Sequence, residues 1–504
     1  MRQARRVAGI GSAAVFAAVL AGCNPQVVSI NGAGTNSGDR ASFRPVVSPD
    51  GTKVAFESWA SDLDGGGSDD YMNIYVRDLT AGTTELVSTN DAGDPPDLDS
   101  IWPVFSPDGT KVVFNSRARN LTPEPGGGGD YALYVRDLVA DTTELVSVDA
   151  SGSVVPGSAP VFSPDGARVA FETGAGGLGP TDGNSSTDVY IRDLGAGTTT
   201  LVSRNAAGSD AANLGATGAV FSPDGTRVGY TSSSTDLGPA DANHVQDAYV
   251  TDLATGTTTL VSHVAGGAAS ANGPSDMGAF SPDGSVLVFR SWATDLVPGT
   301  PVDDFADLFV RDLATGATTR VAANANPAFD NGSFPTPVFS PDGSRFAFVT
   351  NGSGLGATDT VVCRDRNIPP RQFPCQDVYL HDLGTGTTTL VSGNAAGTNG
   401  GNGESFDPDF SPDGSRLVFT SAASDLGPTD TNGQWDVYVA DLATGDVTMA
   451  STKAGGADSA SGRSYEPQFG KDERTVVFGS SAEDMGPGPD TNGTEDVYLK
   501  VLPG

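Results

Sequence analysis

Residues 161–171 read Val-Phe-Ser-Pro-Asp-Gly-Ala-Arg-Val-Ala-Phe, and this stretch decides the fold. Proline supplies a preset φ, aspartate accepts local hydrogen bonds, and glycine adopts the positive φ that a tight turn requires. The short β-branched and aromatic runs on either side are typical of strands. The stretch therefore predicts a β-hairpin.

The Ser-Pro-Asp-Gly motif recurs along the chain. It begins at Ser48, Ser106, Ser163, Ser222, Ser281, Ser340 and Ser411. The spacings are 58, 57, 59, 59, 59 and 71 residues, and 470–473 keeps the surrounding pattern 59 residues after the last copy. The chain therefore contains eight units, and the sixth has an insertion at about residues 357–376.

Each unit contains four strand-like segments, which in the third unit are 160–162, 168–171, 188–194 and 198–203. No segment of comparable length shows helical periodicity. Four antiparallel strands repeated radially predict an all-β, eight-bladed β-propeller.

The ring is predicted to close by joining the two ends of the chain. The eighth unit ends with its third strand at 499–502, and residues 26–30 resemble a fourth strand. Pairing of these segments would complete the last blade and cover an open sheet edge. The alternative is that residues 26–30 form a flexible tether.

Composition excludes several classes of protein. The chain has 504 residues and a net charge of -34, which opposes nucleic-acid binding. No long apolar run follows the N-terminus, so a polytopic membrane protein is excluded. With three His and three Cys, an ordinary zinc or thiol enzyme is not expected.

The repeats resemble the WD-repeat-like propeller repeat of the TolB type, with Ser-Pro-Asp-Gly, an apolar strand and then Tyr-Val-x-Asp-Leu. The resemblance covers nearly the whole chain after residue 22 and implies the propeller fold. The TolB family also has an N-terminal α/β domain and fewer blades. Its role in a cell-envelope complex is therefore not carried over, because a fold alone does not define function.

The N-terminus resembles a bacterial lipoprotein signal. Arg2, Arg5 and Arg6 precede a small and apolar stretch that ends in Leu-Ala-Gly before Cys23. We expect residues 1–22 to be removed, Cys23 to be lipidated, and 23–504 to form the propeller. A simple secretory signal and an uncleaved anchor are the alternatives.

The insertion in the sixth unit carries Cys363 and Cys375, which export would place in an oxidising compartment. A disulfide between them is expected. The loop between them contains Arg364, Arg366 and Arg371, a local excess of positive charge in an acidic chain. This loop is predicted to contact an acidic partner or glycan, or it is a decorated loop whose arginines pair with nearby acids.

In a propeller, the first strand of each blade lines the central channel. The turns between strands 1 and 2 are uniform here, whereas the loops on the opposite, loop-rich face vary, so binding is expected on that face. Arg44, Trp102, Asp407 and Glu466 precede first strands and adjoin the closure point. They are predicted to bind a peptide or sugar at the channel mouth, or simply to fill and solvate it.

Four loops before third strands share oxygen-bearing side chains at positions 1, 3 and 7. Their residues are Asp182, Asn184, Asp188; Asp241, Asn243, Asp247; Asp430, Asn432, Asp436; and Asp490, Asn492, Asp496. This spacing resembles the first half of a calcium loop. The alternative is a set of turns in which Asp and Asn cap the local backbone.

His244, His263 and His381 fall at unrelated positions, and no nucleophile elbow occurs, so we expect the protein not to be an enzyme. The chain is predicted to be a monomeric binding scaffold for an envelope protein or glycan, held to a bacterial membrane by its lipid alone. The short-turn face is predicted to lie toward the bilayer. A carbohydrate-binding or polysaccharide-cleaving propeller and a purely structural envelope protein are the alternatives.

Overall fold

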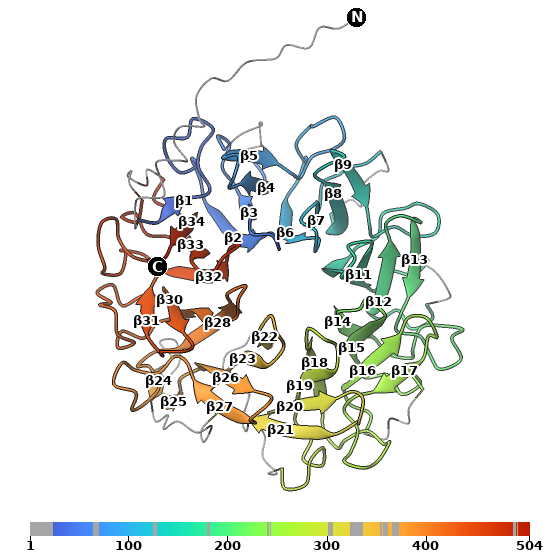
Figure 1. The fold of residues 1–504 in the computed structure, drawn as a ribbon. Coiled ribbons are helices and arrows are strands. Elements are labelled where there is room, and N and C mark those ends of the chain that lie inside the picture. The colour runs from blue at the N-terminus through green and yellow to red at the C-terminus, as the bar shows by residue number, and fades with distance from the viewer. Residues whose placement is uncertain are drawn as a thin grey trace, which may run out of the picture.

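The computed structural model is a ring of eight four-stranded antiparallel sheets, so the predicted eight-bladed β-propeller is confirmed (Figure 1). The structure describes residues 24–63, 70–123, 129–178, 182–238, 241, 243–300, 306–322, 336–352, 355, 361–364, 372–486, 490 and 492–503. No helix occurs among these residues.

The blades follow one another in chain order, and each is named here by its four strands from the channel outward. Blades 1 and 2 are β2 (Ser42–Val47), β3 (Lys53–Ser58), β4 (Asn73–Asp78), β5 (Thr83–Leu86) and β6 (Ser100–Phe105), β7 (Lys111–Ser116), β8 (Ala132–Asp137), β9 (Thr142–Leu145). Blades 3 and 4 are β10 (Ser158–Phe162), β11 (Arg168–Thr173), β12 (Asp188–Asp193), β13 (Thr198–Leu201) and β14 (Ala216–Phe221), β15 (Arg227–Ser232), β16 (Asp247–Asp252), β17 (Thr258–Leu260). Blades 5 and 6 are β18 (Ser275–Phe280), β19 (Val286–Ser291), β20 (Asp307–Asp312), β21 (Thr318–Ala322) and β22 (Val338–Phe339), β23 (Arg345–Thr350), β26 (Asp377–Asp382), β27 (Thr387–Leu390). Blades 7 and 8 are β28 (Ser405–Phe410), β29 (Arg416–Ser421), β30 (Asp436–Asp441), β31 (Val447–Met449) and β32 (Ser464–Phe469), β33 (Thr475–Ser480), β34 (Asp496–Val501), β1 (Gln26–Val27).

The Ser-Pro-Asp-Gly motif forms the turn between strands 1 and 2. In blade 4, Ser222 Oγ donates a hydrogen bond of 2.6 Å to Asp224 Oδ1 and accepts one of 2.9 Å from the Arg227 N–H. Gly225 has a φ of 67°, which suits glycine. The serine-to-aspartate bond recurs in the other six copies of the motif.

Aromatic side chains form the centre of every blade. In each blade a ring on strand 2 stacks on a ring on strand 3, with centroids 5.7–6.3 Å apart. Apolar residues on the sheet faces then join adjacent blades: Ile74 and Val76 of blade 1 pack in one cluster with Phe105 and Val112 of blade 2. The core is therefore a chain of contacts between neighbouring blades around the ring.

The ring closes between the two ends of the chain. β1 pairs antiparallel with β34, and the Val28 N–H donates to the Val497 carbonyl at 2.7 Å. Ser29 Oγ donates to buried Asp496 at 2.8 Å. Blade 8 therefore takes its fourth strand from the N-terminal part of the chain.

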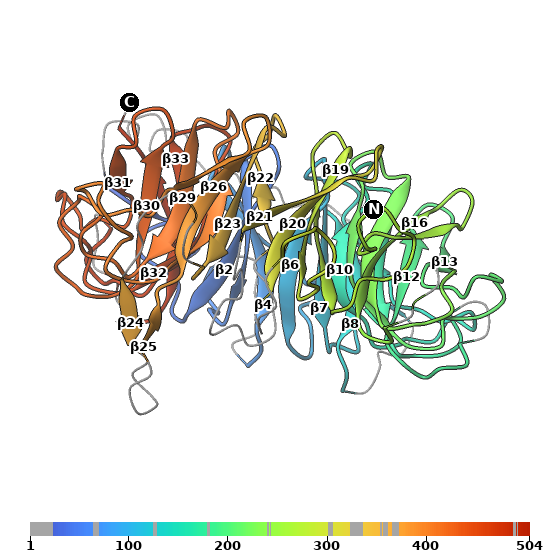
Figure 2. The same ribbon diagram turned by 90° about the horizontal axis from the view of Figure 1, so that it is seen from below.

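The two faces of the ring differ. One carries the short turns between strands 1 and 2 and between strands 3 and 4, and we call the other the loop-rich face. In blade 6, β24 (Val362–Arg364) and β25 (Gln372–Pro374) form a separate hairpin that projects from the loop-rich face (Figure 2). Cys363 and Cys375 are joined by a disulfide within this hairpin.

Candidate functional site

The mouth of the channel on the loop-rich face is built by an unusual backbone. In six blades the register between strands 1 and 2 shifts at a bulge, where one residue of strand 1 has a positive φ. These residues are Arg44, Trp102, Ala159, Gly218, Asp407 and Glu466. A residue other than glycine costs about 1–2 kcal/mol in this left-handed conformation. Backbone strain is therefore concentrated at the mouth.

Trp102 and Arg44 are in contact at this mouth. The Arg44 guanidinium carbon lies 5.8 Å from the Trp102 ring centroid. Trp102 remains 45% exposed, although its backbone is held by Glu57, whose Oε1 accepts the Trp102 N–H at 2.7 Å. A large apolar ring is therefore presented to solvent by a neighbouring blade.

Carboxylates surround this pair. Burial raises the pKa of Glu57 and of Glu466 above their usual range, although Arg44 opposes both shifts. Asp407 reaches the channel solvent, yet the surrounding protein raises its pKa to about 6. The structure thus gathers Arg44, Trp102 and Glu466 with Asp407 and Glu57, close enough for their charges to interact.

The tyrosines and tryptophans outside the blade centres also lie on the loop-rich face. Eight of the eleven tyrosines belong to the blade centres, whereas Tyr71, Tyr131, Tyr465 and all four tryptophans lie at strand ends on this face. Several of these rings contact arginines: Arg117 lies 5.6 Å from Tyr131, and Arg463 lies 5.4 Å from Tyr465. The face therefore offers stacking surfaces next to charged groups.

Sequence reasoning missed Glu57, Tyr131 and Tyr465 as parts of this surface. Glu57 is the fifth residue of β3, a position occupied by Glu172 in β11, where its carboxylate accepts the Gly218 N–H of the next blade at 2.7 Å. The signal was present as a polar residue inside an apolar strand in two repeats.

Other predicted residues are placed less fully. Cys23, Arg366 and Arg371 lie outside the described residues, as does the segment 1–22, and Arg364 is described only as the end of β24. Among the described residues, no helix is long and apolar enough to cross a membrane.

The four aspartate loops share one backbone shape. Position 4 has a positive φ in all of them, at Ser185, His244, Gly433 and Gly493. In the blade 7 loop, Asp430 Oδ1 accepts the Asn432 N–H at 2.9 Å, and Asn432 Oδ1 accepts the Gln434 N–H at 2.5 Å. The asparagines therefore close the loops through the backbone, as the turn interpretation expects.

The aspartate at position 7 is fully buried in each of these loops. Burial raises its pKa to about 6 for Asp188, about 7 for Asp247 and Asp436, and about 8 for Asp496. The aspartate at position 1 adds to each shift through charge repulsion. Within the described residues, no three His, Cys, Asp or Glu side chains group together to hold a metal ion.

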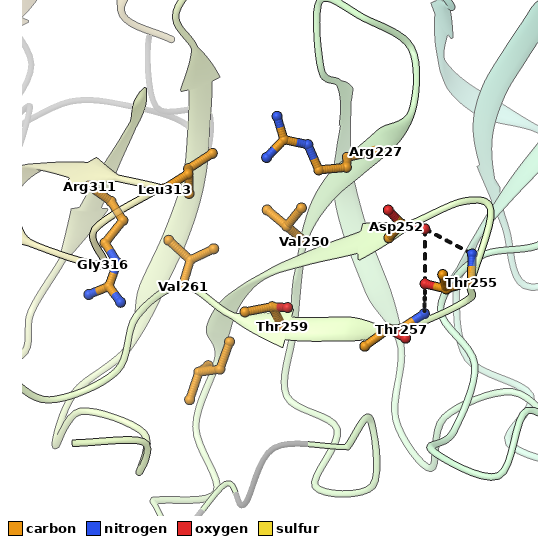
Figure 3. Close-up of a pocket in the computed structure, with 11 residues that line it drawn as sticks. Arg227, Val250, Asp252, Thr255, Thr257, Thr259, Val261, Arg311, Leu313 and Gly316 are labelled. Carbon is orange, nitrogen blue, oxygen red and sulfur yellow. Dashed lines mark hydrogen bonds between the residues drawn. The ribbon is translucent and has the colours of Figure 1, made fainter. Parts of the chain in front are cut away.

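A separate hollow of about 410 Å³ lies between blades 4 and 5. Figure 3 shows Arg311 at one end of its lining and Asp252 with Thr255 at the other, with Arg227, Val250 and Val261 between them. Arg227 donates to the Gly284 carbonyl at 3.0 Å, and Arg311 donates to Thr318 at 2.7 Å. Because its polar groups are already engaged and do not converge, the hollow is a weaker candidate than the mouth.

The three histidines do not meet. His244 lies in the blade 4 loop, His263 donates from Nδ1 to the Val264 carbonyl at 3.0 Å, and Nδ1 of His381 bonds to Thr388 within blade 6. Burial lowers the pKa of His263 and of His381, which favours neutral imidazoles.

Comparison with known proteins gives structural likeness only. No protein-family model matches the chain, and no curated protein matches it. Solved structures that match include an oligogalacturonate lyase in complex with manganese (15% identity, 94% of this chain and 95% of that chain, TM-score 0.44). Another is the oligogalacturonate lyase of Vibrio parahaemolyticus (12% identity, 96% of this chain and 91% of that chain, TM-score 0.44). A third is a putative TolB from Agrobacterium tumefaciens (17% identity, 72% of this chain and 95% of that chain, TM-score 0.34).

These matches include TolB, as the repeat resemblance implies, but their low identities and TM-scores assign no activity to this chain. They also correct one expectation. The prediction that the protein is not an enzyme is wrong, because chains that match over nearly their whole length are lyases.

Proposed function

We propose that this eight-bladed propeller of TolB-like repeats binds a neutral or basic glycan at the channel mouth of its loop-rich face. The observation that carries the proposal is the exposed Trp102 ring, held in a strained backbone conformation by Glu57 beside Arg44. Strained residues persist where the surrounding structure holds them, and they concentrate at binding sites.

The chemistry of the mouth suits a sugar. An aromatic face packs on the apolar side of a sugar ring, while Arg44, Glu466 and Asp407 supply a donor and acceptors for hydroxyl groups. Carboxylates outnumber cations there, and the whole chain has a net charge of -34, so a polyanionic ligand is disfavoured.

Binding of a panel of neutral, basic and acidic oligosaccharides to the full chain, measured by calorimetry, tests the proposal. Trp102→Ala should lower the affinity about 30-fold, the size expected for an aromatic anchor worth about 2 kcal/mol. Val139→Ala is the control, because Val139 is 79% exposed in the turn between β8 and β9 on the opposite face. Equal loss in both variants, or binding of acidic sugars alone, would refute the site.

Cleavage of the bound glycan is the second candidate function. Asp407, with a pKa of about 6, and Glu466, whose pKa is raised, provide carboxyl groups that can differ in protonation near neutral pH. Chromatography of glycans incubated with the full chain should show shorter products that disappear with Asp407→Asn. If the glycans stay unchanged after prolonged incubation, cleavage is refuted and binding is the only function that remains proposed.

We propose further that the protein is exported and anchored to a bacterial membrane through lipidated Cys23. The disulfide between Cys363 and Cys375 supports an oxidising compartment. Asn24 accepts the Gly455 N–H at 2.6 Å, so the residue after Cys23 is tied to the loop between β31 and β32 on the loop-rich side, whereas β1 itself runs from the short-turn side. Metabolic labelling with palmitate should mark the wild-type chain and not Cys23→Ser.

The direction of β1 supports an arrangement with the short-turn face near the bilayer and the channel mouth facing away from it, whereas the Asn24–Gly455 bond favours the reverse. The β24–β25 hairpin, which projects from the loop-rich face, would then be available to an envelope protein or glycan, with the propeller acting as a monomer (Figure 2). Surface labelling of anchored protein should modify the loop-rich face more than the short turns, and the reverse pattern would refute the orientation.

A further inference from the structure

The four aspartate loops contain buried negative charge that no described side chain neutralises. In blades 3, 4, 7 and 8 the Oδ2 atom at position 1 is buried and has no hydrogen-bond partner; these residues are Asp182, Asp241, Asp430 and Asp490. Asp241 is only 8% exposed as a whole residue. A buried carboxylate oxygen without a partner is strongly unfavourable.

A second carboxylate lies beside each of these oxygens. In blade 7, Asp436 is fully buried, and its Oδ1 accepts a hydrogen bond of 2.7 Å from Ser451. Its Oδ2, like that of Asp430, is buried without a hydrogen-bond partner. Asp430 and Asp436 are close enough to repel each other electrostatically. The blade 7 loop therefore presents two unpartnered carboxylate oxygens to one small volume. In blades 3, 4 and 8 the Oδ2 atom of the position-7 aspartate instead accepts a hydrogen bond of 3.0–3.3 Å from Nδ2 of the asparagine at position 3, so the unpartnered oxygen there is the one at position 1.

Blade 5 shows how the same position is neutralised elsewhere in the chain. Asp307 begins β20 as Asp436 begins β30, and Arg320 Nε lies 2.6 Å from Asp307 Oδ2. Arg320 pairs in register with Phe309, where blade 7 places Met449 opposite Tyr438. A cationic side chain thus replaces an apolar one in the blade that lacks the aspartate loop.

Blades 1 and 2 avoid the charge altogether. Their third strands begin with Asn73 and Ala132 at this position. In blades 3, 4, 7 and 8 no ion pair to either loop aspartate occurs among the described residues. Among the described residues, the acid at this position is absent in blades 1 and 2 and is paired with Arg320 in blade 5. In blade 6 it is Asp377, which accepts a hydrogen bond of 2.6 Å from Ser392, and in blades 3, 4, 7 and 8 it is one of two loop aspartates with no ion pair.

We propose that each of these four loops binds one Ca²⁺ ion between the aspartates at positions 1 and 7. The donors are oxygen atoms alone, which selects a hard cation over zinc or copper. The asparagine at position 3 orients the loop rather than binding the ion, because its Oδ1 already accepts a backbone N–H. Calcium accepts six to eight oxygen ligands in irregular geometry, so water and backbone carbonyls can complete each site.

Calorimetry and elemental analysis of the full chain, first stripped with a chelator and then titrated with Ca²⁺, test this inference. We expect about four bound ions per chain, one for each loop with the unpartnered aspartate oxygen. The melting temperature should rise by several degrees in Ca²⁺ and much less in Mg²⁺ at the same concentration. Absence of binding, or an equal shift with Mg²⁺, would overturn the calcium assignment.

Variants of the blade 7 loop separate an ion site from a simple turn. Asp436→Asn should remove about one ion per chain. In chelator its melting temperature should lie above that of the wild type, because a buried charge without a cation is gone. In Ca²⁺ its melting temperature should rise by less than that of the wild type. Asp446→Asn, in the exposed turn between β30 and β31, is the matched control and should match the wild type. If Asp436→Asn fails to fold, Asp241→Asn tests the same prediction in blade 4. A variant that keeps all its ions refutes the site.

Discussion

The two faces of the ring treat carboxylates in opposite ways. On the short-turn face, the hydroxyl of each motif serine bonds the aspartate, and this bond is the main reason that the pKa values of Asp108, Asp224 and Asp342 fall to about 2. At the channel mouth, burial raises the pKa values of Glu57 and Glu466, and the surrounding protein raises that of solvent-exposed Asp407. The short-turn face therefore stabilises its ionised aspartates in one repeated turn. The channel mouth on the loop-rich face instead contains carboxylates whose ionisation is unfavourable and residues with strained backbone.

This difference indicates a division of labour. Within each uniform turn the motif serine and aspartate satisfy each other, so the same turn can recur in successive repeats around the ring. The loop-rich face holds groups that only a ligand, an ion or a neighbouring side chain can satisfy. Residues that lower the stability of the fold in this way are expected at functional sites.

The largest expected effect is loss of Arg320, which neutralises the buried third-strand aspartate Asp307 on the loop-rich face. Arg320→Leu should destabilise the protein by about 3 kcal/mol, because buried Asp307 would lose its arginine partner. Chemical denaturation measures the change. The double variant Arg320→Leu/Asp307→Asn should recover most of the stability, and equal losses in the single and double variants would contradict the neutralisation argument.

A smaller effect is expected from the turns of the opposite face. Ser222→Ala should cost roughly 1–2 kcal/mol, since the buried hydroxyl both donates to Asp224 and accepts the Arg227 N–H. Ser209, exposed in the segment between blades 3 and 4, provides the control. Ser209→Ala should leave the denaturation midpoint unchanged; a similar loss in both would mean that the motif serine has no special role.

The fold could be predicted because its signal is local and repeated. Ser-Pro-Asp-Gly dictates a hairpin, and seven copies at near-constant spacing imply a radial array, so even the closing strand could be identified by comparison with other fourth strands. The mouth was predicted only in part. Arg44 and Trp102 could be placed by counting from the motif, but Glu57 becomes a neighbour of Trp102 only through the packing of blade 1 on blade 2.

The aspartate loops show a different limit of sequence reasoning. The spacing of Asp430, Asn432 and Asp436 fitted both a calcium loop and a simple turn, since both use the same residues. The asparagine geometry is that of a turn, whereas the unpartnered aspartate oxygens point to an ion. Hydrogen-bond partners depend on three-dimensional contacts, so no pattern in the chain could separate the two interpretations.

The smallest expected effect is the opposite response of the two faces to pH. A carboxyl group with a raised folded-state pKa stabilises the protein at low pH, and this contribution is lost as pH rises through that value, about 6 for Asp407. A group with a lowered pKa contributes stability above its ordinary value near 3.8, and this is lost as pH falls toward about 2, as for Asp224. Melting temperatures of Asp407→Asn and Asp224→Asn, compared with wild type in chelator, separate the two contributions.

Asp407→Asn should raise the melting temperature relative to wild type at pH 7 by a degree or two, and this gain should shrink toward pH 4, where the wild-type carboxyl is protonated. Asp224→Asn should lower it at pH 7, with the deficit shrinking toward pH 2 as the wild-type carboxyl loses its charge. The signs differ because the surroundings of Asp407 disfavour its charged form, whereas the hydrogen bonds to Asp224 stabilise its charged form. Variants that shift in the same direction at pH 7 would show that the two faces do not differ in this way.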